Sequence, residues 1–409
     1  VKNQFDSNYG IDQLVFMDGT LITRDDINNM ALSDHYIQDN VIIGDENSNT
    51  LEDSLGNDIL EGGTGPDTYV FKKGYGQDLI RESYYGLTQD YDIVQFGAGL
   101  TPLTMDIVRE GNNLVFKVIG TSDRLTIQDQ FEFPAELISI EEFRFGDGTV
   151  WSKEDIKQEI INRTSTSEND IIQGYSENGQ GVIGDNSKET LDGGLGNDIL
   201  MAGTGNDNYV FNYGYGRDII QESEYIWDSN YDIVKFGVGL TPSSMKITRE
   251  SNDLIFTVIG TTDSLRIKEQ FNSYSESYSI EEFHFDNDSL IWTKSDIKNY
   301  LLVSDSTDNT IQGYSESGAP GIGDNSKELL DGGWGNDLLQ GETGDDTYIF
   351  NYGYGQDIIQ EGEYFWDSTY DSIKFGVGLN LQTMEIYHRG NTLVFQVIGT
   401  NDQLIINDQ

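Results

Sequence analysis

Residues 56–71 have the sequence GNDILEGGTGPDTYVF, and closely related stretches occur twice more, as GNDILMAGTGNDNYVF at 196–211 and GNDLLQGETGDDTYIF at 335–350. Each stretch contains tandem copies of the nine-residue pattern GGxGxDxUx, in which U is a large apolar residue. The copies lie 140 residues apart (Asp58 to Asp198) and 139 residues apart (Asp198 to Asp337). A near-fixed period of this length indicates an array of repeated structural units.

The residue types in the pattern have a direct physical meaning. Glycines at positions one, two and four allow φ > 0 and bring backbone carbonyl oxygens close together, which a Cβ would obstruct. The aspartate at position six adds an anionic oxygen, and Ca²⁺ binds roughly six to eight oxygens. Positions seven to nine, for example Ile59, Leu60 and Glu61, predict a short strand whose central side chain points inward. The pattern therefore predicts alternating turns and strands, with calcium at the turns.

These blocks resemble the RTX, or haemolysin-type calcium-binding, repeats of bacterial exoproteins. The resemblance implies a parallel β-roll in which two nonapeptides make one coil and calcium lies between successive turns, with roughly two to three ions per unit. A further turn, in KGYGQDLI, YGYGRDII and YGYGQDII, adds a third aspartate to each unit. The implied aspartate ligands are Asp58, Asp67, Asp78, Asp198, Asp207, Asp218, Asp337, Asp346 and Asp357. The implied glycine ligands are Gly56, Gly63, Gly65, Gly76, Gly194, Gly196, Gly203, Gly205, Gly216, Gly333, Gly335, Gly344 and Gly355.

Some copies depart from the pattern. The nonapeptides at 44–52, 184–192 and 323–331 carry Asn49, Glu189 and Glu328 at the aspartate position, and we expect these coils to bind calcium weakly or not at all. The Gly-Gly pair is replaced by Ala202-Gly203 and by Gly341-Glu342, which weakens the case for those carbonyl ligands. An alternative stays open, in which the aspartates only form Asx-turns and bind no metal.

A segment of different character follows each block, and it is clearest from Asp92 to Ile161. Its apolar and β-branched residues alternate as in antiparallel strands, and Ser152 with Asp155 forms a capping-box signal for a short helix at about 153–161. The segment resembles the haemolysin-type calcium-binding-protein-related domain. The expected fold class is all-β, with tandem parallel β-roll segments that are each followed by a small antiparallel β module and a short helix.

The expected division of the chain follows this alternation. We expect residues 1–30 to be the tail of a preceding β module, so that the chain is a piece of a longer array. The expected units are 31–161 (β-roll 35–82, β module 92–161), 162–301 (β-roll 165–222, β module 232–301) and 302–409 (β-roll 304–361, partial β module 371–409).

Composition is consistent with an acidic, secreted calcium protein. The net charge is −47 and the isoelectric point is near 4.1, and such self-repulsion opposes a compact state until cations neutralise it. The same charge argues against nucleic acid or an anionic membrane as a partner. The chain has no Cys, so metal rather than disulfides is expected to staple the fold. It has no apolar run of about 20 residues, and no membrane span is expected.

Catalysis has little support in the sequence. His35, His284 and His388 stand at non-equivalent places in the repeats, and neither a cysteine nucleophile nor a GxSxG motif is present. We therefore expect no enzyme activity from this chain. Aromatic–acidic runs at 83–92, 224–232 and 363–371 are candidates for glycan contact through Trp227 and Trp366, or for capping the end of the roll against the β module.

The expected function is a calcium-gated folding and spacer array in a secreted exoprotein that passes through type I secretion machinery and acts outside the cell or at the bacterial surface. Coupling of metal binding to folding makes such gating possible. Two alternatives stay open. One is an adhesin-like module that recognises a glycan or a cell-surface partner, and the other is an accessory part of a polysaccharide-modifying enzyme. In the family, toxins, lipases, proteases and adhesins all carry such repeats.

Overall fold

The computed structural model describes residues 13–16, 20–23, 39–52, 55–82, 91–131, 139–175, 188–222, 231–272, 279–304, 306–314, 327–361 and 370–407. The chain divides into two compact units, each of which is described by itself. The first unit comprises Val1–Ser165, Gln173–Thr190 and Gly203–Gly205, and the second comprises Thr166–Ile172, Leu191–Ala202 and Asn206–Gln409. The first repeat therefore lies in the first unit, and most of the second repeat and all of the third lie in the second unit.

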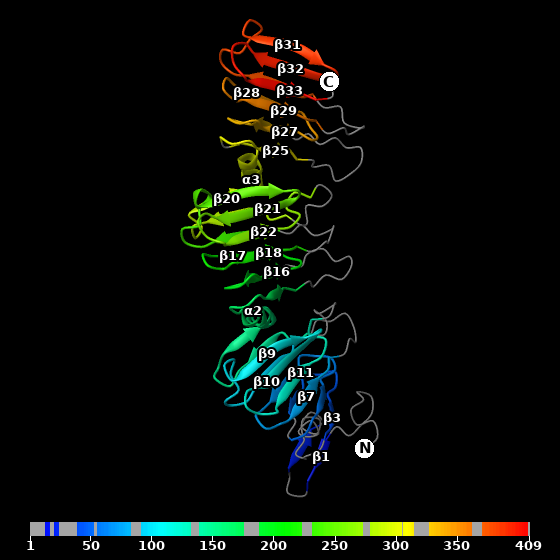
Figure 1. Cartoon of the computed structure of the whole chain (residues 1–409). Helices are drawn as coiled ribbons and strands as arrows, with labels where there is room; N and C mark the ends of the chain where they lie inside the picture. Colours follow the sequence, from blue (N-terminus) through cyan, green and yellow to red (C-terminus); the bar gives the residue numbers. More distant parts are fainter. Residues whose placement is uncertain are drawn as a thin grey trace. The chain divides into compact units, whose positions relative to one another are not determined.

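Each repeat is built from two β-sheets of short strands (Figure 1). In the first repeat, the six-stranded sheet has the order β3 (Val41–Ile43), β5 (Ile59–Glu61), β7 (Gln77–Ile80), β11 (Arg124–Ile127), β10 (Asn113–Val118), β9 (Met105–Glu110). The five-stranded sheet has the order β13 (Val150–Ser152), β12 (Glu142–Arg144), β8 (Ile93–Phe96), β6 (Thr68–Phe71), β4 (Thr50–Glu52). A separate two-stranded sheet is formed by β1 (Gln13–Val15) and β2 (Leu21–Thr23).

The second and third repeats have the same plan. In the second repeat, the six-stranded order is β14 (Ile171–Gln173), β16 (Ile199–Met201), β18 (Arg217–Ile220), β22 (Ser264–Ile267), β21 (Asp253–Val258), β20 (Met245–Glu250), and the five-stranded order is β15 (Thr190–Asp192), β17 (Asn208–Phe211), β19 (Ile233–Phe236), β23 (Glu282–Phe285), β24 (Leu290–Thr293). In the third, the six-stranded order is β25 (Thr310–Gln312), β27 (Leu338–Gln340), β29 (Gln356–Ile359), β33 (Gln403–Ile406), β32 (Thr392–Val397), β31 (Met384–Arg389), and a three-stranded sheet has the order β26 (Leu329–Asp331), β28 (Thr347–Phe350), β30 (Ser372–Phe375).

The nonapeptide strands stack in parallel as the pattern predicts. Ile59 of β5 pairs with Val41 of β3 on one side and with Leu79 of β7 on the other. The central residue Leu60 is 1% exposed, whereas its neighbours Ile59 and Glu61 are half-buried. One inward side chain per short strand is what the nine-residue repeat specifies, and this prediction is confirmed.

The β module is continuous with the roll, which differs from the expectation of a separate antiparallel module. Strand β11 pairs in parallel with β7, β8 pairs in parallel with β6, and β12 pairs in parallel with β8. Among the described strands of this repeat, only the pairs β9–β10, β10–β11 and β12–β13 are antiparallel. Alternating apolar residues suit either direction, so the sequence pattern alone could not distinguish them.

Each of the first two modules ends in a short helix. Helix α2 (Lys153–Thr164) begins at Ser152, whose side chain accepts the N–H of Asp155 while the Asp155 side chain accepts the N–H of Ser152. Helix α3 (Lys294–Leu301) has the same capping box, between Thr293 and Asp296. Helix α2 is therefore three residues longer than the expected end at 161. In the described part of the chain, neither helix is long and apolar enough to cross a membrane.

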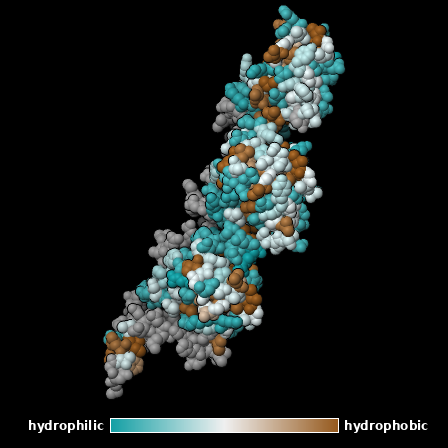
Figure 2. All heavy atoms as spheres, turned by 90° about the vertical axis from the view of Figure 1, so that its left-hand side faces the viewer, coloured by the Kyte–Doolittle hydropathy of each residue, from teal (hydrophilic) through white to brown (hydrophobic). Residues whose placement is uncertain are grey.

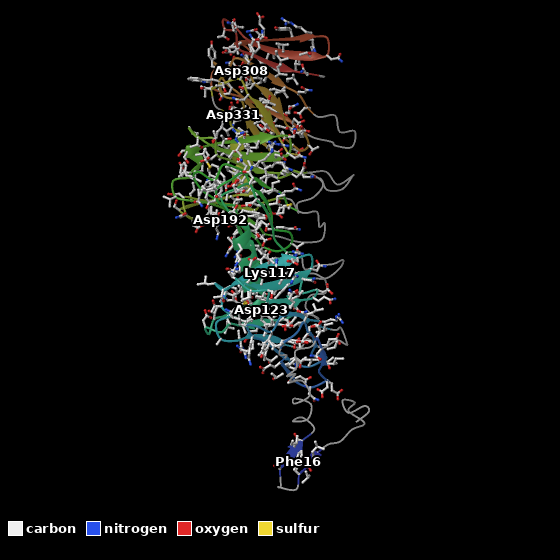
Figure 3. All side chains as sticks on the ribbon, turned by 60° about the horizontal axis from the view of Figure 1, so that its bottom comes forward. Phe16, Lys117, Asp123, Asp192, Asp308 and Asp331 are labelled. Atoms are coloured by element: carbon white, nitrogen blue, oxygen red, sulfur yellow. The ribbon has the colours of Figure 1, made fainter. Side chains whose placement is uncertain are left out.

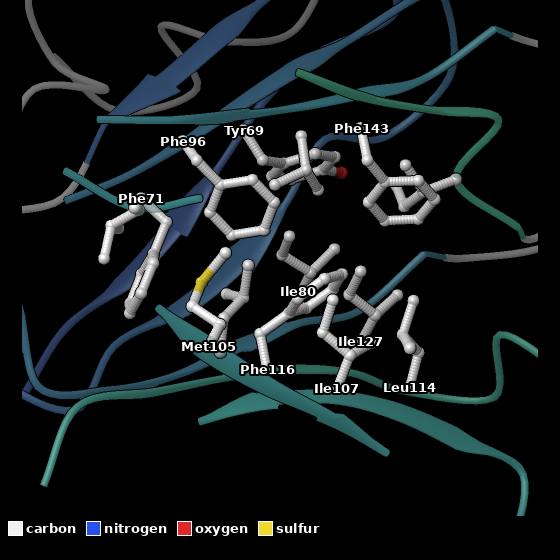
Figure 4. Packing of buried hydrophobic residues seen from close by; sticks show 14 of the residues in the cluster. Tyr69, Phe71, Ile80, Phe96, Met105, Ile107, Leu114, Phe116, Ile127 and Phe143 are labelled. Atoms are coloured by element: carbon white, nitrogen blue, oxygen red, sulfur yellow. The ribbon is translucent and has the colours of Figure 1, made fainter. Parts of the chain in front are cut away.

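Side chains from both sheets meet in an aromatic core. In the first repeat, the Phe96 ring packs on Phe116, at a centroid distance of 4.8 Å, and on Phe145, at 5.0 Å. Phe96 and Phe116 are seen in Figure 4. The second repeat reproduces this packing, with Phe236 at 4.9 Å from both Phe256 and Phe285. On the face seen in Figure 2, hydrophobic residues form small patches among hydrophilic ones. The apolar content is thus mainly used inside each repeat.

In the nonapeptide turn of the third repeat, a non-glycine residue has positive φ at a position where the first two repeats have glycine. Glu342 has φ +70°, and it stands where the first two repeats have Gly63 (φ +105°) and Gly203 (φ +103°). Left-handed backbone costs an L-residue roughly 1–2 kcal/mol.

We predict that Glu342→Gly stabilises the third repeat by about 1 kcal/mol, because glycine adopts positive φ without a steric cost. At the equivalent position of the second repeat, Gly203→Ala should destabilise by about 1–2 kcal/mol, because it places a Cβ on backbone of positive φ. Hydrogen exchange of the strands that flank each turn, measured in excess calcium, would detect both effects. Faster exchange around residue 342 in Glu342→Gly would contradict the prediction.

Candidate metal centre

The predicted ligand aspartates form a ladder on one side of each roll. Asp58, Asp198 and Asp337 stand directly before their strands, whereas Asp78, Asp218 and Asp357 are the second residues of theirs. The Oδ1 of each accepts a backbone N–H from the preceding coil. In the first repeat, Asp58 Oδ1 accepts the N–H of Asn40 at 2.6 Å, and Asp78 Oδ1 accepts the N–H of Asp58 at 3.0 Å. The equivalent bonds run from Asp170 N to Asp198 at 2.8 Å, Asp198 N to Asp218 at 3.0 Å, Asn309 N to Asp337 at 2.7 Å and Asp337 N to Asp357 at 3.0 Å. The ladder connects coils, since donor and acceptor lie 18 to 28 residues apart.

A second ladder runs along the other sheet, and it is longer than the sequence pattern indicated. Asp67 Oδ1 accepts the N–H of Asn49 at 2.7 Å, and Asp92 Oδ1 accepts the N–H of Asp67 at 2.8 Å. Glu141 then accepts the N–H of Asp92 at 2.8 Å. The equivalent bonds run from Asp207 N to Asp232 at 2.8 Å, Asp232 N to Glu281 at 2.7 Å, Glu328 N to Asp346 at 2.9 Å and Asp346 N to Asp371 at 3.1 Å.

Sequence reasoning missed Asp92, Asp232 and Asp371 as members of this ladder. They lie outside the nonapeptides, 25 residues after the aspartate of the preceding coil rather than 18. A signal was present, because each follows a tyrosine and directly precedes a strand, in YDIVQF, YDIVKF and YDSIKF.

The second carboxylate oxygen, Oδ2, of several ladder aspartates takes no part in the ladder hydrogen bonds. Oδ2 of Asp198, Asp218, Asp232 and Asp357 is buried and has no hydrogen-bond partner among the described residues. These side chains are at most 2% exposed. A buried carboxylate is costly unless a positive group compensates it, and buried charges in proteins are paired or bind metals. The orphaned oxygens therefore fit a site that is completed by a cation.

The turns bring carbonyl oxygens to the same place. Every glycine predicted as a ligand has positive φ, from +67° at Gly333 to +156° at Gly56. Gly56 forms a parallel bridge with Gly76 of the next turn, and a Cβ on Gly76 would collide with the carbonyl oxygen of Gly56. The same bridge joins Gly196 to Gly216 and Gly335 to Gly355. Stacked glycines thus direct carbonyl oxygens between successive turns.

Among the described residues, no group of three or more His, Cys, Asp or Glu side chains is arranged to hold a metal ion. The groups that the described turns do bring together are single carboxylates and the backbone carbonyl oxygens of the stacked glycines. Calcium accepts such a mixed, all-oxygen set, whereas zinc favours nitrogen and sulfur. The residues fit calcium, which would supply the positive charge that the buried aspartates lack.

Asx-turns are present at other aspartates. Asp192 and Asp331, labelled in Figure 3, accept the N–H of Gly194 and Gly333, each at 3.1 Å and only two residues away. Bonds of this short range are the ones expected if an aspartate only forms an Asx-turn and binds no metal. The position-six aspartates instead accept N–H groups from another coil, so an Asx-turn does not explain their placement.

The electrostatics of the ladders is unfavourable without a cation. Burial raises the pKa of Asp218 and of Asp357 to about 7, and the charges of Asp198 and Asp337 on the preceding coils contribute. Burial and the charge of Asp92 raise the pKa of Glu82 to about 8. A raised carboxyl pKa means that the folded state disfavours the ionised form.

A tyrosine–glutamate pair accompanies the second ladder in each repeat, and the sequence pattern did not predict it. The Tyr69 hydroxyl donates a hydrogen bond to the Glu82 carboxylate and accepts one from the N–H of Gly62 at 2.8 Å. The same hydroxyl-to-carboxylate bond joins Tyr209 to Glu222 and Tyr348 to Glu361. Each pair ties the inward side chain of a roll strand to the end of the following coil.

Of the other residues singled out in the sequence, His284 is described and lies outside both ladders. His284 hydrogen-bonds Glu282 at 2.8 Å and Asp288 at 2.6 Å on the module surface. His35, Trp227 and Trp366, with most of the aromatic–acidic runs, lie outside the described residues. The proposed glycan contact through these tryptophans stays a prediction.

Comparison with known protein families agrees with this geometry. The family profile of the RTX calcium-binding nonapeptide repeat matches residues 37–69, 183–211 and 322–349. The profile of the haemolysin-type calcium binding protein related domain matches residues 113–155 and 253–296. Segments that match the RTX repeat thus alternate along the chain with segments that match the haemolysin-type related domain, and the resemblance inferred from the sequence is confirmed for these segments.

Similar individual proteins include the iron-regulated protein FrpA of Neisseria meningitidis serogroup C, which is 33% identical over 130 residues. That match spans 32% of this chain and about a tenth (10%) of FrpA. A search of solved structures returns the extracellular lipase LipA of Serratia marcescens, at 15% identity and a TM-score of 0.18, covering 59% of this chain and 40% of the lipase.

The raised pKa values predict how the calcium-free protein responds to pH. Between the ordinary aspartate pKa of 3.8 and the folded value of about 7, the folded state holds protons that the unfolded chain has released. Stability of the calcium-free fold therefore falls as pH rises through this window. We expect circular dichroism in calcium-free buffer to show more β-structure at about pH 5 than at about pH 8.

The variant Asp218→Asn removes one of these protons and should reduce the pH dependence. The surface variant Asp106→Asn, which lies outside both ladders, serves as the control. A calcium-free fold that instead gains structure as pH rises from about 5 to about 8 would contradict the assignment.

Proposed function

We propose that this chain is a calcium-gated folding and spacer region of a secreted bacterial exoprotein. Its RTX repeats are of the calcium-binding class. Whatever effector activity accompanies them, we propose that these repeats supply a scaffold that forms only where calcium is abundant, and that they are not themselves catalytic.

The observation that carries the proposal is the set of buried aspartate oxygens without partners, at Asp198, Asp218, Asp232 and Asp357. Folding brings these anions out of water, and it does so in a chain of net charge −47. Calcium binds the folded turns and has far less to bind in the extended chain, so binding free energy becomes folding free energy. The equilibrium between the unfolded and folded chain then depends on the calcium concentration.

Gated folding suits export through type I secretion machinery, which we propose as a partner. In the low-calcium cytosol the chain stays extended and can pass through a narrow conduit, and in the calcium-rich exterior it folds. The absence of cysteine fits this route, because no disulfide has to form after export. The location that follows is extracellular or at the bacterial surface.

Within this scheme, we propose that each repeat of β-roll plus β module is one folding step, with divisions at 31–161, 162–301 and 302–409. The parallel pairs β7–β11 and β6–β8 support this, because the module strands need the roll strands as hydrogen-bonding partners. Calcium at the roll would then also control the module.

We expect circular dichroism at neutral pH to show a largely unfolded chain in excess EGTA and a β-rich one after calcium is added. Mass spectrometry under native conditions should count roughly two to three Ca²⁺ per repeat. Full β-structure in EGTA at neutral pH would refute gating.

Single changes at the ladder should weaken this response. Asp198→Asn keeps an Oδ1 that can accept the N–H of Asp170 but loses the anionic oxygen, so the calcium concentration for half-maximal folding of the second repeat should rise about tenfold, equivalent to roughly 1.4 kcal/mol. The matched control is Asp192→Asn, since Asp192 lies outside both ladders and accepts the N–H of Gly194 and the hydroxyl of Tyr215 rather than an N–H of the preceding coil. An equal effect of both changes would argue against a special role for the ladder.

A further inference from the structure

The second unit contains a cavity of about 410 Å³, and none of the predicted calcium ligands lines it. It lies between β20, which is the outer strand of one six-stranded sheet, and β25, which is the outer strand of the next. Helix α3 and the residues that follow it form its third wall. In Figure 1 this helix is seen between β20 and β25. Its volume is within the range of roughly 300–1,000 Å³ that is usual for small-molecule sites.

The charge of this cavity is opposite to that of the protein. The sequence has 71 acidic and 24 basic residues, yet the described lining residues include Lys246 and Arg249 and no Asp or Glu. Lys246 is exposed and makes no ion pair with any described residue. An anion that the rest of the surface repels would be attracted here.

Arg249 holds the two walls together. Its Nη1 donates to the carbonyl oxygens of Gln312 at 3.2 Å and Gly313 at 2.7 Å. Its guanidinium lies over the ring of Phe271, at 5.1 Å, and over the ring of Tyr314, at 4.8 Å, and these two rings are in contact with each other. The arginine therefore fixes the geometry of the cavity, and Lys246 is the cation that is available to a ligand.

In the first repeat, an arginine occupies the place that corresponds to the α3 wall of this cavity. There Arg163, in the last turn of α2, donates to the carbonyl oxygens of Met105 at 2.8 Å and Pro102 at 2.7 Å and pairs with Glu159 at 2.7 Å. Helix α3 has 8 residues against 12 in α2, and Ser304 stands where Arg163 would be. The short serine cannot span that distance.

Two further exchanges between these repeats change the same corner. Tyr300 replaces Glu159, and Lys246 replaces Asp106. Together with the loss of the arginine, they open the space, remove two acidic residues and add a cation and an aromatic ring. Tyr300 is 42% exposed and packs on Trp292 at a centroid distance of 5.3 Å.

We infer that this cavity binds a carboxylate-bearing sugar residue. The ammonium of Lys246 pairs with the carboxylate, and the Tyr300 ring offers a flat surface to the sugar ring. The remaining lining supplies hydroxyl and amide groups, from Thr248, Ser251, Thr310 and Gln312, that suit the hydroxyls of a sugar. The inference goes beyond the calcium-gated scaffold and needs only that the second unit is folded.

The test uses the full chain in excess calcium, with glucuronate as the probe and glucose as its neutral counterpart. Isothermal titration calorimetry should give a dissociation constant on the order of 1 mM for glucuronate and at least about tenfold weaker binding for glucose. Lys246→Asp, which introduces the residue of the first repeat, should weaken glucuronate binding by about tenfold or more. The matched control Asp106→Lys, in the first repeat, should leave it unchanged.

Three results would overturn the inference: no binding of glucuronate up to about 20 mM, equal binding of glucose, or unchanged binding by Lys246→Asp. Equal affinity for N-acetylglutamate would also overturn it, because the site would then recognise acidic peptides rather than sugars. Calcium-dependent circular dichroism checks that the variant folds. If Lys246→Asp fails to fold, Tyr300→Glu, again a residue of the first repeat, decides by the same measurement.

Discussion

An aspartate carboxylate buried between coils is the constraint on which each repeat depends. One oxygen accepts a backbone N–H from the preceding coil, as Asp218 does from Asp198, and so fixes the register of the parallel strands. The other oxygen of Asp218 is buried and has no hydrogen-bond partner within the described part of the chain. The same side chain thus specifies the register of the roll and places an uncompensated carboxylate oxygen inside it. In the proposed scheme, stability and calcium binding are linked because they use the two oxygens of one group.

The effect of this constraint extends beyond the turns that carry it. The module strands β8 and β11 hydrogen-bond directly to the roll strands β6 and β7, and their side chains complete the same core. The module thus takes the edges of the roll as its template. A roll that loses its register would also expose Phe96 and Phe116, which are fully buried in the folded repeat.

The repeats share this scaffold but differ at its periphery. The third repeat tolerates Glu342 at positive φ where the others have glycine. In the second repeat, the short helix α3 and Ser304 leave open a corner that Arg163 fills in the first. Ladder residues are maintained where they hold coils together, whereas residues at the ends of the helices vary. Such a division lets an array keep one folding mechanism while individual repeats acquire different surfaces.

The sequence by itself determined the class of fold, the period of the array, the inward residue of each nonapeptide strand and the aspartates that head those strands. These are local properties, because positive φ at glycine, alternation along a strand and a capping box such as Ser152 with Asp155 each involve only a few neighbouring residues. Only the tertiary structure decided that the modules continue the parallel sheets, and that Asp92, Asp232 and Asp371 extend the second ladder. Strand direction and ladder membership depend on which segments pair across 25 or more residues, and alternating apolar residues permit more than one partner.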